Sequence, residues 1–446
     1  MAFSEQLINP VLDHPYVRMV IESITDKSLF KMSKNDLADK RKMLLREHLK
    51  YLRDQSDFYA DMLKNVGVNP DNATIEDIIK LAISSNQWRG DGYRKYLIPP
   101  IQNFAEKAEH VDDPEKYGKW VRSSGTTGQV PVRVYRSQLD LAIQEHADIA
   151  IVANFIASKE SGIGLILAAE EMKYDLGFIY GVEDFLKQRG AEVVWGMQID
   201  ETVEAKTIFA KMRPDKKAIA SFLKSEVEPK FILTAPVGIW QMLKGQDAVN
   251  KLRGIKGFFA KKMSGLDKPI DLGKGGVLFS GGGTKSIAMP PLEELISSSR
   301  ERIIARDEHG NQIPAPWIDT LAQTENITLL TSCSQWKDGQ LVLPDSLLKT
   351  PHPLAEVVLV DPRTHKIVGP GQEGEFLYYN PFSLSVLEAF YPGEIGRTHK
   401  KDNCYGQSFE FVRSLQVDEG GLDRACGGKM EEMMESNIKE VESNAA

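Results

Sequence analysis

The stretch Ser123-Ser124-Gly125-Thr126-Thr127-Gly128 decides how this sequence is interpreted. All six residues are glycine or carry a small hydroxyl group, so the stretch cannot fill a hydrophobic core. Backbone amides and hydroxyls of such residues can instead converge on an oxyanion. An apparent strand precedes the stretch and an apparent helix follows it. The pattern therefore predicts a loop that holds a polyphosphate.

This loop is not a P-loop of the nucleotide-binding kinases and ATPases. The required pattern G-x-x-x-x-G-K-[ST] is absent. The nearest match, GGGTKS at residues 281–286, has Thr284 where the second glycine belongs. P-loop phosphotransferases are therefore disfavoured.

The composition is that of a globular protein. Of 446 residues, 42% are apolar and 26% are charged, and this length predicts more than one hydrophobic core. The net charge of -8 disfavours a nucleic-acid partner, because binding phosphate backbones requires a concentrated basic face. There is neither a signal-peptide pattern nor an apolar run long enough to span a membrane, so we expect a cytoplasmic protein. Three cysteines without C-x-x-C spacing predict neither a disulfide framework nor a zinc site.

Apolar periodicity predicts an α/β fold. Apolar residues recur at steps of three and four between residues 27 and 65, which predicts a helical N-terminal region. Short apolar runs bounded by glycine follow, and they alternate with helical stretches, as in a doubly wound sheet. These runs are GIGLILAAE (162–170), AEVVWGM (191–197), KFILTAPVGI (230–239), GGVLFSGGG (275–283) and AEVVLV (355–360).

We expect four successive segments along the chain. Residues 1–100 form the N-terminal helical part, and residues 101–368 form the α/β core that contains the predicted phosphate loop. Residues 369–412 form a β-rich subdomain, and residues 413–446 form a short C-terminal segment.

The phosphate loop resembles that of the adenylate-forming superfamily, which includes acyl-CoA synthetases and phenylacetate-CoA ligases. The closest resemblance is to the acyl-protein synthetase of the bacterial luminescence fatty-acid reductase. The resemblance covers about residues 40–430 and implies the adenylate-forming fold with a truncated C-terminal domain. In many of those proteins a lysine follows the loop, whereas Val132 and Arg133 follow Pro131 here, so Arg133 is the candidate for that cationic contact.

Two further segments occur in the order that this family requires. The run Gly281-Gly282-Gly283-Thr284-Lys285 resembles the turn that packs on adenine, where side chains would block a flat base. Thr324-Glu325 matches the family's threonine and glutamate, whose implied roles are contact with phosphate and binding of Mg2+. A carboxylate suits a hard cation beside phosphate. Leu321 and Ala322 replace the tyrosine and glycine of the family motif.

The C-terminal region supplies the remaining candidates. Asp402 resembles the ribose-binding aspartate, and Arg413 lies where the family has its hinge. Only 33 residues follow Arg413, as in the luminescence-type synthetase, whose terminal segment carries the acyl-accepting cysteine. Cys426 matches that cysteine, and Arg424 and Lys429 beside it would favour the thiolate. Cys404 is the reserve candidate.

The resemblance implies activation of a carboxylic acid, with a fatty acid as the first candidate, by ATP and Mg2+. The acyl group would pass to Cys426 and then to a partner such as an acyl-CoA-reductase-like protein. A second interpretation sends it to coenzyme A or a carrier protein, and a third is a non-catalytic nucleotide-binding protein on the same fold. The candidate acyl pocket consists of Phe231, Pro236, Ile239 and Trp240.

Overall fold

The computed structural model describes residues 9–110, 116–123, 130–153, 160–174, 176–203, 211–251, 266, 268–281, 289–399 and 408–415. Its chain folds into two compact units that alternate along the sequence. Unit 1 comprises Met1–Ile151, Ala322–Thr331 and Leu348–Asp423, and unit 2 comprises Val152–Leu321, Ser332–Leu347 and Arg424–Ala446. The limits at residues 100, 368 and 412 that the sequence suggested are not limits of these units.

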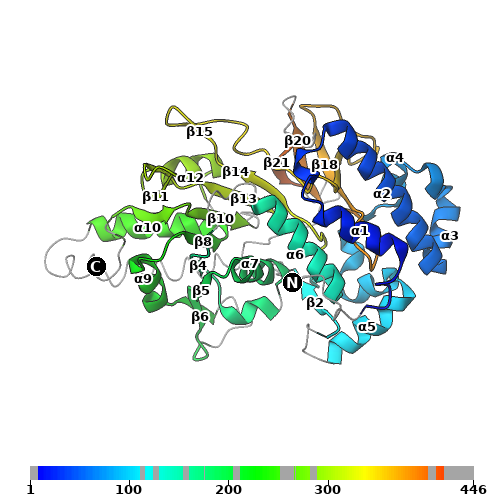
Figure 1. Ribbon diagram of the computed structural model, residues 1–446, viewed down its shortest axis with the longest axis horizontal. Coiled ribbons are helices and arrows are strands. Elements are labelled where there is room, and N and C mark those ends of the chain that lie inside the picture. Colours follow the sequence, from blue (N-terminus) through cyan, green and yellow to red (C-terminus); the bar gives the residue numbers. More distant parts are fainter. Residues whose placement is uncertain are drawn as a thin grey trace. The chain divides into compact units, whose positions relative to one another are not determined.

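Unit 2 is built around a six-stranded sheet with the order β14-β13-β10-β8-β4-β5 (Figure 1). From β13 to β5, neighbouring strands of this sheet pair in parallel. The strands are β4 (Ile163–Ile166), β5 (Glu192–Trp195), β8 (Lys230–Thr234), β10 (Val277–Gly281), β13 (Trp317–Leu321) and β14 (Leu330–Cys333). Four of the five predicted apolar runs therefore supply strands of one sheet.

Alternate residues of each strand face opposite sides of this sheet. Both faces carry apolar side chains, and helices cover both. On one face Leu165, Ile232 and Leu278 belong to a core cluster that also contains Phe222, Ile239 and Leu295. These last three lie on α9 (Lys216–Lys224), α10 (Pro236–Lys251) and α12 (Leu292–Ser299). On the other face Phe185 of α7 (Gly177–Gln188) stacks on Phe279 and meets Phe231 edge-on. Figure 1 shows α7 and α9 on either side of β4 and β5. The predicted doubly wound core is confirmed.

Smaller elements complete unit 2. Strands β9 (Ile270–Lys274), β11 (Ile303–Arg306) and β12 (Gln312–Pro314) form a three-stranded sheet. Two-stranded pairs are formed by β6 (Met197–Ile199) with β7 (Met212–Pro214) and by β15 (Trp336–Lys337) with β16 (Gln340–Leu341). The 3-10 turn Glu170–Tyr174 precedes α7.

Unit 1 contains a second six-stranded sheet, which is mainly antiparallel. Its order is β1-β19-β18-β20-β21, and β17 pairs with β18. The strands are β1 (Ile83–Ser84), β17 (Glu356–Val360), β18 (Glu373–Asn380), β19 (Glu388–Tyr391), β20 (Glu394–Thr398) and β21 (Phe409–Ser414). The run at 355–360, expected in the doubly wound core, is thus β17 of this antiparallel sheet.

Helices of unit 1 pack beside this sheet. They are α1 (Pro15–Thr25), α2 (Lys34–Gln55), α3 (Asp57–Val66), α4 (Ile75–Leu81), α5 (Pro99–His110) and α6 (Gln138–Ala153), with 3-10 turns at Leu29–Lys31, Pro70–Asn72, Ser85–Trp88 and Gly90–Tyr96. The side chain of Ser33 caps α2 by accepting a hydrogen bond from the Asp36 amide. Tyr51 on the buried face of α2 donates its hydroxyl proton to the Leu384 carbonyl. The single helical region expected over 27–65 is divided between α2 and α3 at Ser56.

A two-stranded hairpin leads into α6. Its strands, β2 (Lys119–Arg122) and β3 (Arg133–Arg136), are antiparallel, with Arg122 opposite Arg133 and Lys119 opposite Arg136. The predicted phosphate loop therefore lies between the two strands β2 and β3, whereas the sequence predicted a strand before the loop and a helix after it. Helix α6 begins only at Gln138.

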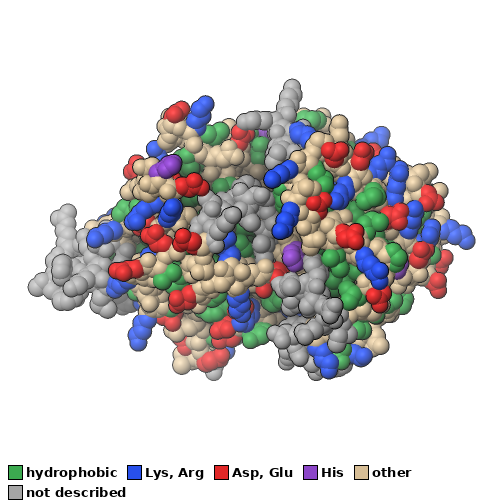
Figure 2. All heavy atoms as spheres, viewed as in Figure 1, with side chains coloured by type: hydrophobic (Ala, Val, Ile, Leu, Met, Phe, Trp, Pro, Cys, Tyr) green, Lys and Arg blue, Asp and Glu red, His purple; other side chains and the backbone are tan. Residues whose placement is uncertain are grey.

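The face in Figure 2 shows Lys and Arg side chains interspersed with Asp and Glu side chains. Within the described ranges, no helix combines the length and hydropathy that a membrane span requires.

Candidate functional site

Ser123, the first residue of the predicted phosphate loop, is hydrogen-bonded to Val132, which follows the loop in the sequence. The Ser123 amide donates to the Val132 carbonyl at 2.9 Å, and the Val132 amide donates to Ser123 Oγ at 3.0 Å. On the C-terminal side, Arg89 donates to the Val130 carbonyl at 2.7 Å. These contacts fix where the loop leaves and rejoins the hairpin. The other predicted loop residues, Ser124, Gly125, Thr126, Thr127 and Gly128, lie outside the described residues.

Arg133, the candidate replacement for the missing lysine, is already engaged at the hairpin. It donates to Glu109 Oε1 at 2.8 Å, and its guanidinium lies 4.5 Å from the centre of the Trp120 ring. Arg94 also pairs with Glu109 and lies over the same ring. Burial acts to raise the pKa of Glu109, but the hydrogen bonds from Arg94 and Arg133 outweigh it and hold that pKa below its usual value. Glu109 therefore stays ionised and neutralises part of the charge of Arg133.

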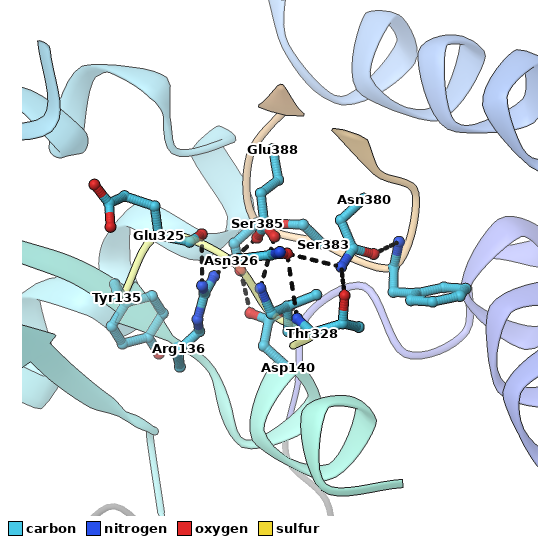
Figure 3. Close-up of polar contacts among 12 residues, drawn as sticks. Tyr135, Arg136, Asp140, Glu325, Asn326, Thr328, Asn380, Ser383, Ser385 and Glu388 are labelled. Carbon is cyan, nitrogen blue, oxygen red and sulfur yellow. Dashed lines mark hydrogen bonds and ion pairs between the residues drawn. The ribbon is translucent and has the colours of Figure 1, made fainter. Parts of the chain in front are cut away.

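Thr324 and Glu325 occupy a short turn of unit 1 that follows β13. The Asn326 amide closes this turn by donating to the Gln323 carbonyl at 3.0 Å. Arg136 Nη2 donates to the Glu325 carbonyl at 2.8 Å and to the Thr324 carbonyl at 3.3 Å (Figure 3). Glu325 is 4% exposed, and in Figure 3 its carboxylate points away from the guanidinium. The backbone is thus bound on one side while the carboxylate projects to the other.

Buried polar residues surround this turn. Glu388 is fully buried and accepts hydrogen bonds from Arg136 Nη1 at 3.1 Å and from the Ile327 amide at 2.6 Å. Asn380 Nδ2 donates to Asn326 Oδ1 at 3.3 Å and to Thr328 Oγ1 at 3.1 Å (Figure 3). Burial raises the pKa of Glu388 to about 7, although the positive charge of Arg136 acts to lower it.

The donor chemistry around Glu325 fits Mg2+ only in combination with substrate. Among the described residues no group of three or more His, Cys, Asp or Glu side chains is placed to hold a metal ion. Mg2+ bound through one or two carboxylates completes its octahedron with water and substrate phosphate oxygens. Glu325 fits that arrangement, in which the nucleotide brings most of the ligands.

The predicted adenine turn begins at the end of β10 in unit 2. A Cβ atom on Gly281 would collide with the Phe178 ring and with Thr320 Oγ1. Gly281 is therefore required by the close approach of these two side chains. Gly282, Gly283 and Lys285 lie outside the described residues, so the turn beyond Gly281 is not placed.

The four predicted acyl-pocket residues lie on two faces of the unit 2 sheet. Ile239 is buried in the core cluster of α9, α10 and α12, and Trp240 packs against that cluster. Phe231 faces the opposite side, where it meets Phe185. Pro236 is buried at the first position of α10. The structure therefore does not bring Phe231 together with Ile239 and Trp240.

The remaining candidates are near the C-terminus. Arg413 lies on β21, with Nε 3.9 Å from Glu373 Oε2. Asp402, Cys404 and Cys426 lie outside the described residues. Cys333 ends β14, and burial raises the pKa of its thiol to about 12, so it is protonated at neutral pH.

One solved structure with a similar fold is an acid-CoA ligase. An open conformation of 2-hydroxyisobutyryl-CoA ligase, in complex with 2-HIB-AMP and CoA, matches with a TM-score of 0.50 and 12% identity, over 83% of this chain and 67% of that chain. The fold is that of the adenylate-forming enzymes. The chain spans about two thirds of the length of that ligase.

Other ligases match more weakly. A long-chain-fatty-acid-CoA ligase from Archaeoglobus fulgidus has a TM-score of 0.41 and 14% identity, over 69% of this chain and 53% of that chain. The o-succinylbenzoate CoA synthetase from Bacillus subtilis has a TM-score of 0.37 and 14% identity, over 69% and 49%. No known family model and no curated protein sequence matches the chain.

Sequence patterns did not indicate Arg136 or Glu388 as site residues. Each is a charged residue at one end of a short strand, without a motif around it. Their partnership spans 252 positions of the sequence. One signal is that Arg136 ends a strand whose Val and Tyr residues are buried. Because an unpaired buried charge is costly, an arginine in that position indicates an acidic partner.

Proposed function

We propose that this chain is an ATP-dependent acid-thiol ligase that converts a carboxylic acid, with a fatty acid as the first candidate, into an acyl adenylate. The observation that carries the proposal is the adenylate-forming fold combined with the S-S-G-T-T-G stretch on a hairpin and the Thr324-Glu325 turn bound to that hairpin through Arg136. The fold alone hosts several chemistries. Among these chemistries, the two motifs favour a reaction at the phosphates of a nucleotide.

In the first step a carboxylate oxygen of the acid attacks the α-phosphorus of ATP. An oxygen–phosphorus bond forms, the bond between the α and β phosphates breaks, and pyrophosphate leaves. Negative charge accumulates on the phosphoryl oxygens, so donors and cations aimed at them lower the barrier. Hydroxyls and amides of residues 123–128 would donate to these oxygens, and Glu325 with Thr324 would hold Mg2+ and a phosphate oxygen. Lys285 would add a positive charge, Gly281, Gly282, Gly283 and Asp402 would hold the adenosine, and Arg413 would lie at the hinge.

In the second step a thiolate attacks the carbonyl carbon of the acyl adenylate. A carbon–sulfur bond forms and AMP leaves with the electron pair of the former carbon–oxygen bond. Cys426 is our first candidate for the thiol, because Arg424 and Lys429 flank it and would lower its pKa. A thioester on Cys426 could then be passed to a partner protein such as a reductase of acyl thioesters.

Coenzyme A or a carrier-protein thiol is the second candidate acceptor. It is favoured by the similarity in fold to a ligase crystallised with CoA. In that case Cys426 takes no part in the transfer.

The first half-reaction is tested by acid-dependent exchange of labelled pyrophosphate into ATP. We expect exchange with at least one acid in a panel of graded chain length and aromaticity. Glu325→Gln should lower the exchange rate on the order of 100-fold, since an aligned Mg2+ supplies several kcal/mol of charge stabilisation. Glu356→Gln, another carboxylate of unit 1, is the matched control and should retain the rate. ATP binding without exchange for any acid would support a non-catalytic nucleotide-binding protein.

The acceptor is tested with Cys426→Ala. If Cys426 accepts the acyl group, the variant retains pyrophosphate exchange but no longer incorporates labelled acid covalently. Production of acyl-CoA at the wild-type rate by this variant would rule out Cys426 and support the second acceptor.

A further inference from the structure

Arg136 makes three directed contacts from a buried position in unit 1. Its side chain is 2% exposed. Nη2 donates to the carbonyls of Thr324 and Glu325, and Nη1 donates to Glu388 Oε2. Figure 3 shows the guanidinium between the turn and the Glu388 carboxylate. One planar group thus links two backbone carbonyls to a buried acid.

Glu388 extends this linkage to the other side of the turn. Its Oε1 accepts a hydrogen bond from the Ile327 amide at 2.6 Å. Arg136 and Glu388 together therefore bind the carbonyls of Thr324 and Glu325 and the amide of Ile327. The backbone of Glu325 lies between the hydrogen bonds from Arg136 and the hydrogen bond to Glu388. A turn bound on both sides has a fixed backbone, and this backbone sets the point from which the Glu325 side chain projects.

The buried Arg136–Glu388 ion pair carries a desolvation penalty, and a contribution to core stability does not by itself explain why the pair is present. Replacing a buried ion pair by apolar residues of similar volume is often neutral or stabilising. An arginine–carboxylate pair supplies fixed geometry instead, because the guanidinium presents its donors in a rigid plane. Arg136 is held in turn by strand β3, where it lies opposite Lys119.

Strand β3 carries two features at its opposite ends. Val132, next to its first residue, pairs with Ser123 at the base of the predicted phosphate loop, and Arg136 at its last residue binds the turn of Glu325. The four-residue strand β3 therefore relates the position of Ser123 to that of the Thr324-Glu325 turn.

We propose that Arg136 is a positioning residue for adenylation, which holds the backbone of Thr324 and Glu325 so that the Glu325 carboxylate is placed to bind the Mg2+ of a Mg2+-triphosphate. The role rests on the proposed function of the chain. In this role Arg136 acts through the backbone of Thr324 and Glu325, not through contact with ATP or the acid.

The test is the Mg2+ dependence of pyrophosphate exchange in Arg136→Lys. Lysine preserves the charge facing Glu388 but lacks the planar fork that bonds two carbonyls and an acid together. We expect the Mg2+ concentration for half-maximal exchange to rise about tenfold and the maximal rate to fall by a similar factor, comparable to the effect of losing a residue that orients a metal ligand. The KM for the acid should be unchanged.

Arg41→Lys is the matched control. Arg41 also pairs with a glutamate, Glu356, at 2.8 Å and donates to a carbonyl, that of Pro353, at 2.8 Å, but it does not contact the turn. This variant should retain the wild-type Mg2+ dependence at a similar melting temperature. Equal Mg2+ dependence in the Arg136→Lys and Arg41→Lys variants would overturn the positioning role.

A double variant covers the case in which Arg136→Lys does not fold. Arg136→Met with Glu388→Met removes both buried charges at nearly constant volume, and Arg41→Met with Glu356→Met is its counterpart. We expect an increased Mg2+ requirement in the first double variant only. Wild-type protein in the same assay separates the two hypotheses: no exchange with any acid refutes the proposed function, whereas exchange with wild-type Mg2+ dependence in the Arg136 variants refutes only the positioning role.

Discussion

At the scale of single residues, burial of histidines makes the stability of unit 1 depend on pH. His48 is fully buried, with Nδ1 3.0 Å from the Tyr379 hydroxyl and Nε2 2.9 Å from the Ser383 carbonyl. A carbonyl can only accept, so Nε2 carries the proton and Nδ1 accepts from Tyr379. Burial lowers the pKa of His48 to about 3, and it lowers the pKa of His352 to the same value.

The sign of the effect follows from the two pKa values. Unfolded histidine binds a proton below about pH 6.5, while folded His48 stays neutral down to about pH 3. The stabilisation is therefore complete above pH 6.5 and is lost as the pH falls, by about 1.4 kcal/mol per pH unit for each histidine. His48→Gln should make the unfolding free energy less steep by about this amount between pH 6 and 5, as measured by chemical denaturation. An unchanged slope would show that His48 is protonated in the folded protein.

At the scale of elements, the contact between strand β4 and helix α7 depends on a glycine. A Cβ atom at Gly164 would come well inside van der Waals contact with both terminal methyl groups of Leu186, which is fully buried on α7. The absence of a side chain at Gly164 therefore sets how closely the helix approaches the sheet.

Gly164→Ala should lower the unfolding free energy by about 1–3 kcal/mol through overpacking. In a Leu186→Ala background the same substitution should cost less, because the colliding methyl groups are gone, and the difference is the coupling of a double-mutant cycle. Urea denaturation of the four proteins measures it. Additive effects of the two substitutions would contradict the contact.

Sequence patterns predicted some of these elements better than others. The strands of the unit 2 sheet are apolar runs bounded by glycine, and their alternation with helices indicates parallel pairing. Strand β3 escaped prediction, since R-V-Y-R contains two charged residues in four and is too short to show alternation. The buried Arg136–Glu388 pair could not be predicted either, because charged residues are ordinarily solvent-exposed and only the folded chain brings these two together.

The candidate site residues also differ in how far sequence patterns can predict them. Thr324 and Glu325 are predicted from their motif and its order along the chain, and the structure adds how their backbone is bound. The predicted acyl pocket rested on apolar residues near one strand and helix. Such residues serve core packing equally well, and the pleat of β8 turns Phe231 away from the face that Ile239 covers.

At the scale of the whole molecule, the alternating course of the chain determines which fragments can fold. All six strands of the unit 2 sheet lie within residues 152–347. Residues 152–321 alone lack β14 and also Ser334, whose amide donates to the Trp317 carbonyl at 2.8 Å and whose Oγ accepts the Trp317 amide at 2.8 Å. Trp317 belongs to the core cluster of the unit.

We expect the fragment 152–347 to unfold cooperatively and the fragment 152–321 to melt at a lower temperature or without a cooperative transition. The cause is the loss of an edge strand and two buried hydrogen bonds, each of which leaves an unsatisfied backbone group that costs about 1–3 kcal/mol. Thermal melts followed by circular dichroism measure this difference. Identical transitions in both fragments would show that β14 contributes nothing to the sheet.

The pairing of β1 with β19 has a consequence for how the chain folds during its synthesis on the ribosome. Ile83 finds its partner Phe390 roughly three hundred residues later, so at about 5–20 residues per second it waits some 15–60 s for it. During that interval residues 152–347, which contain all six strands of the unit 2 sheet, leave the ribosome, while the first helices of unit 1 still expose apolar faces that their sheet will cover. Chaperones that hold nascent chains should accordingly bind the N-terminal helices of this protein longer than any part of its middle.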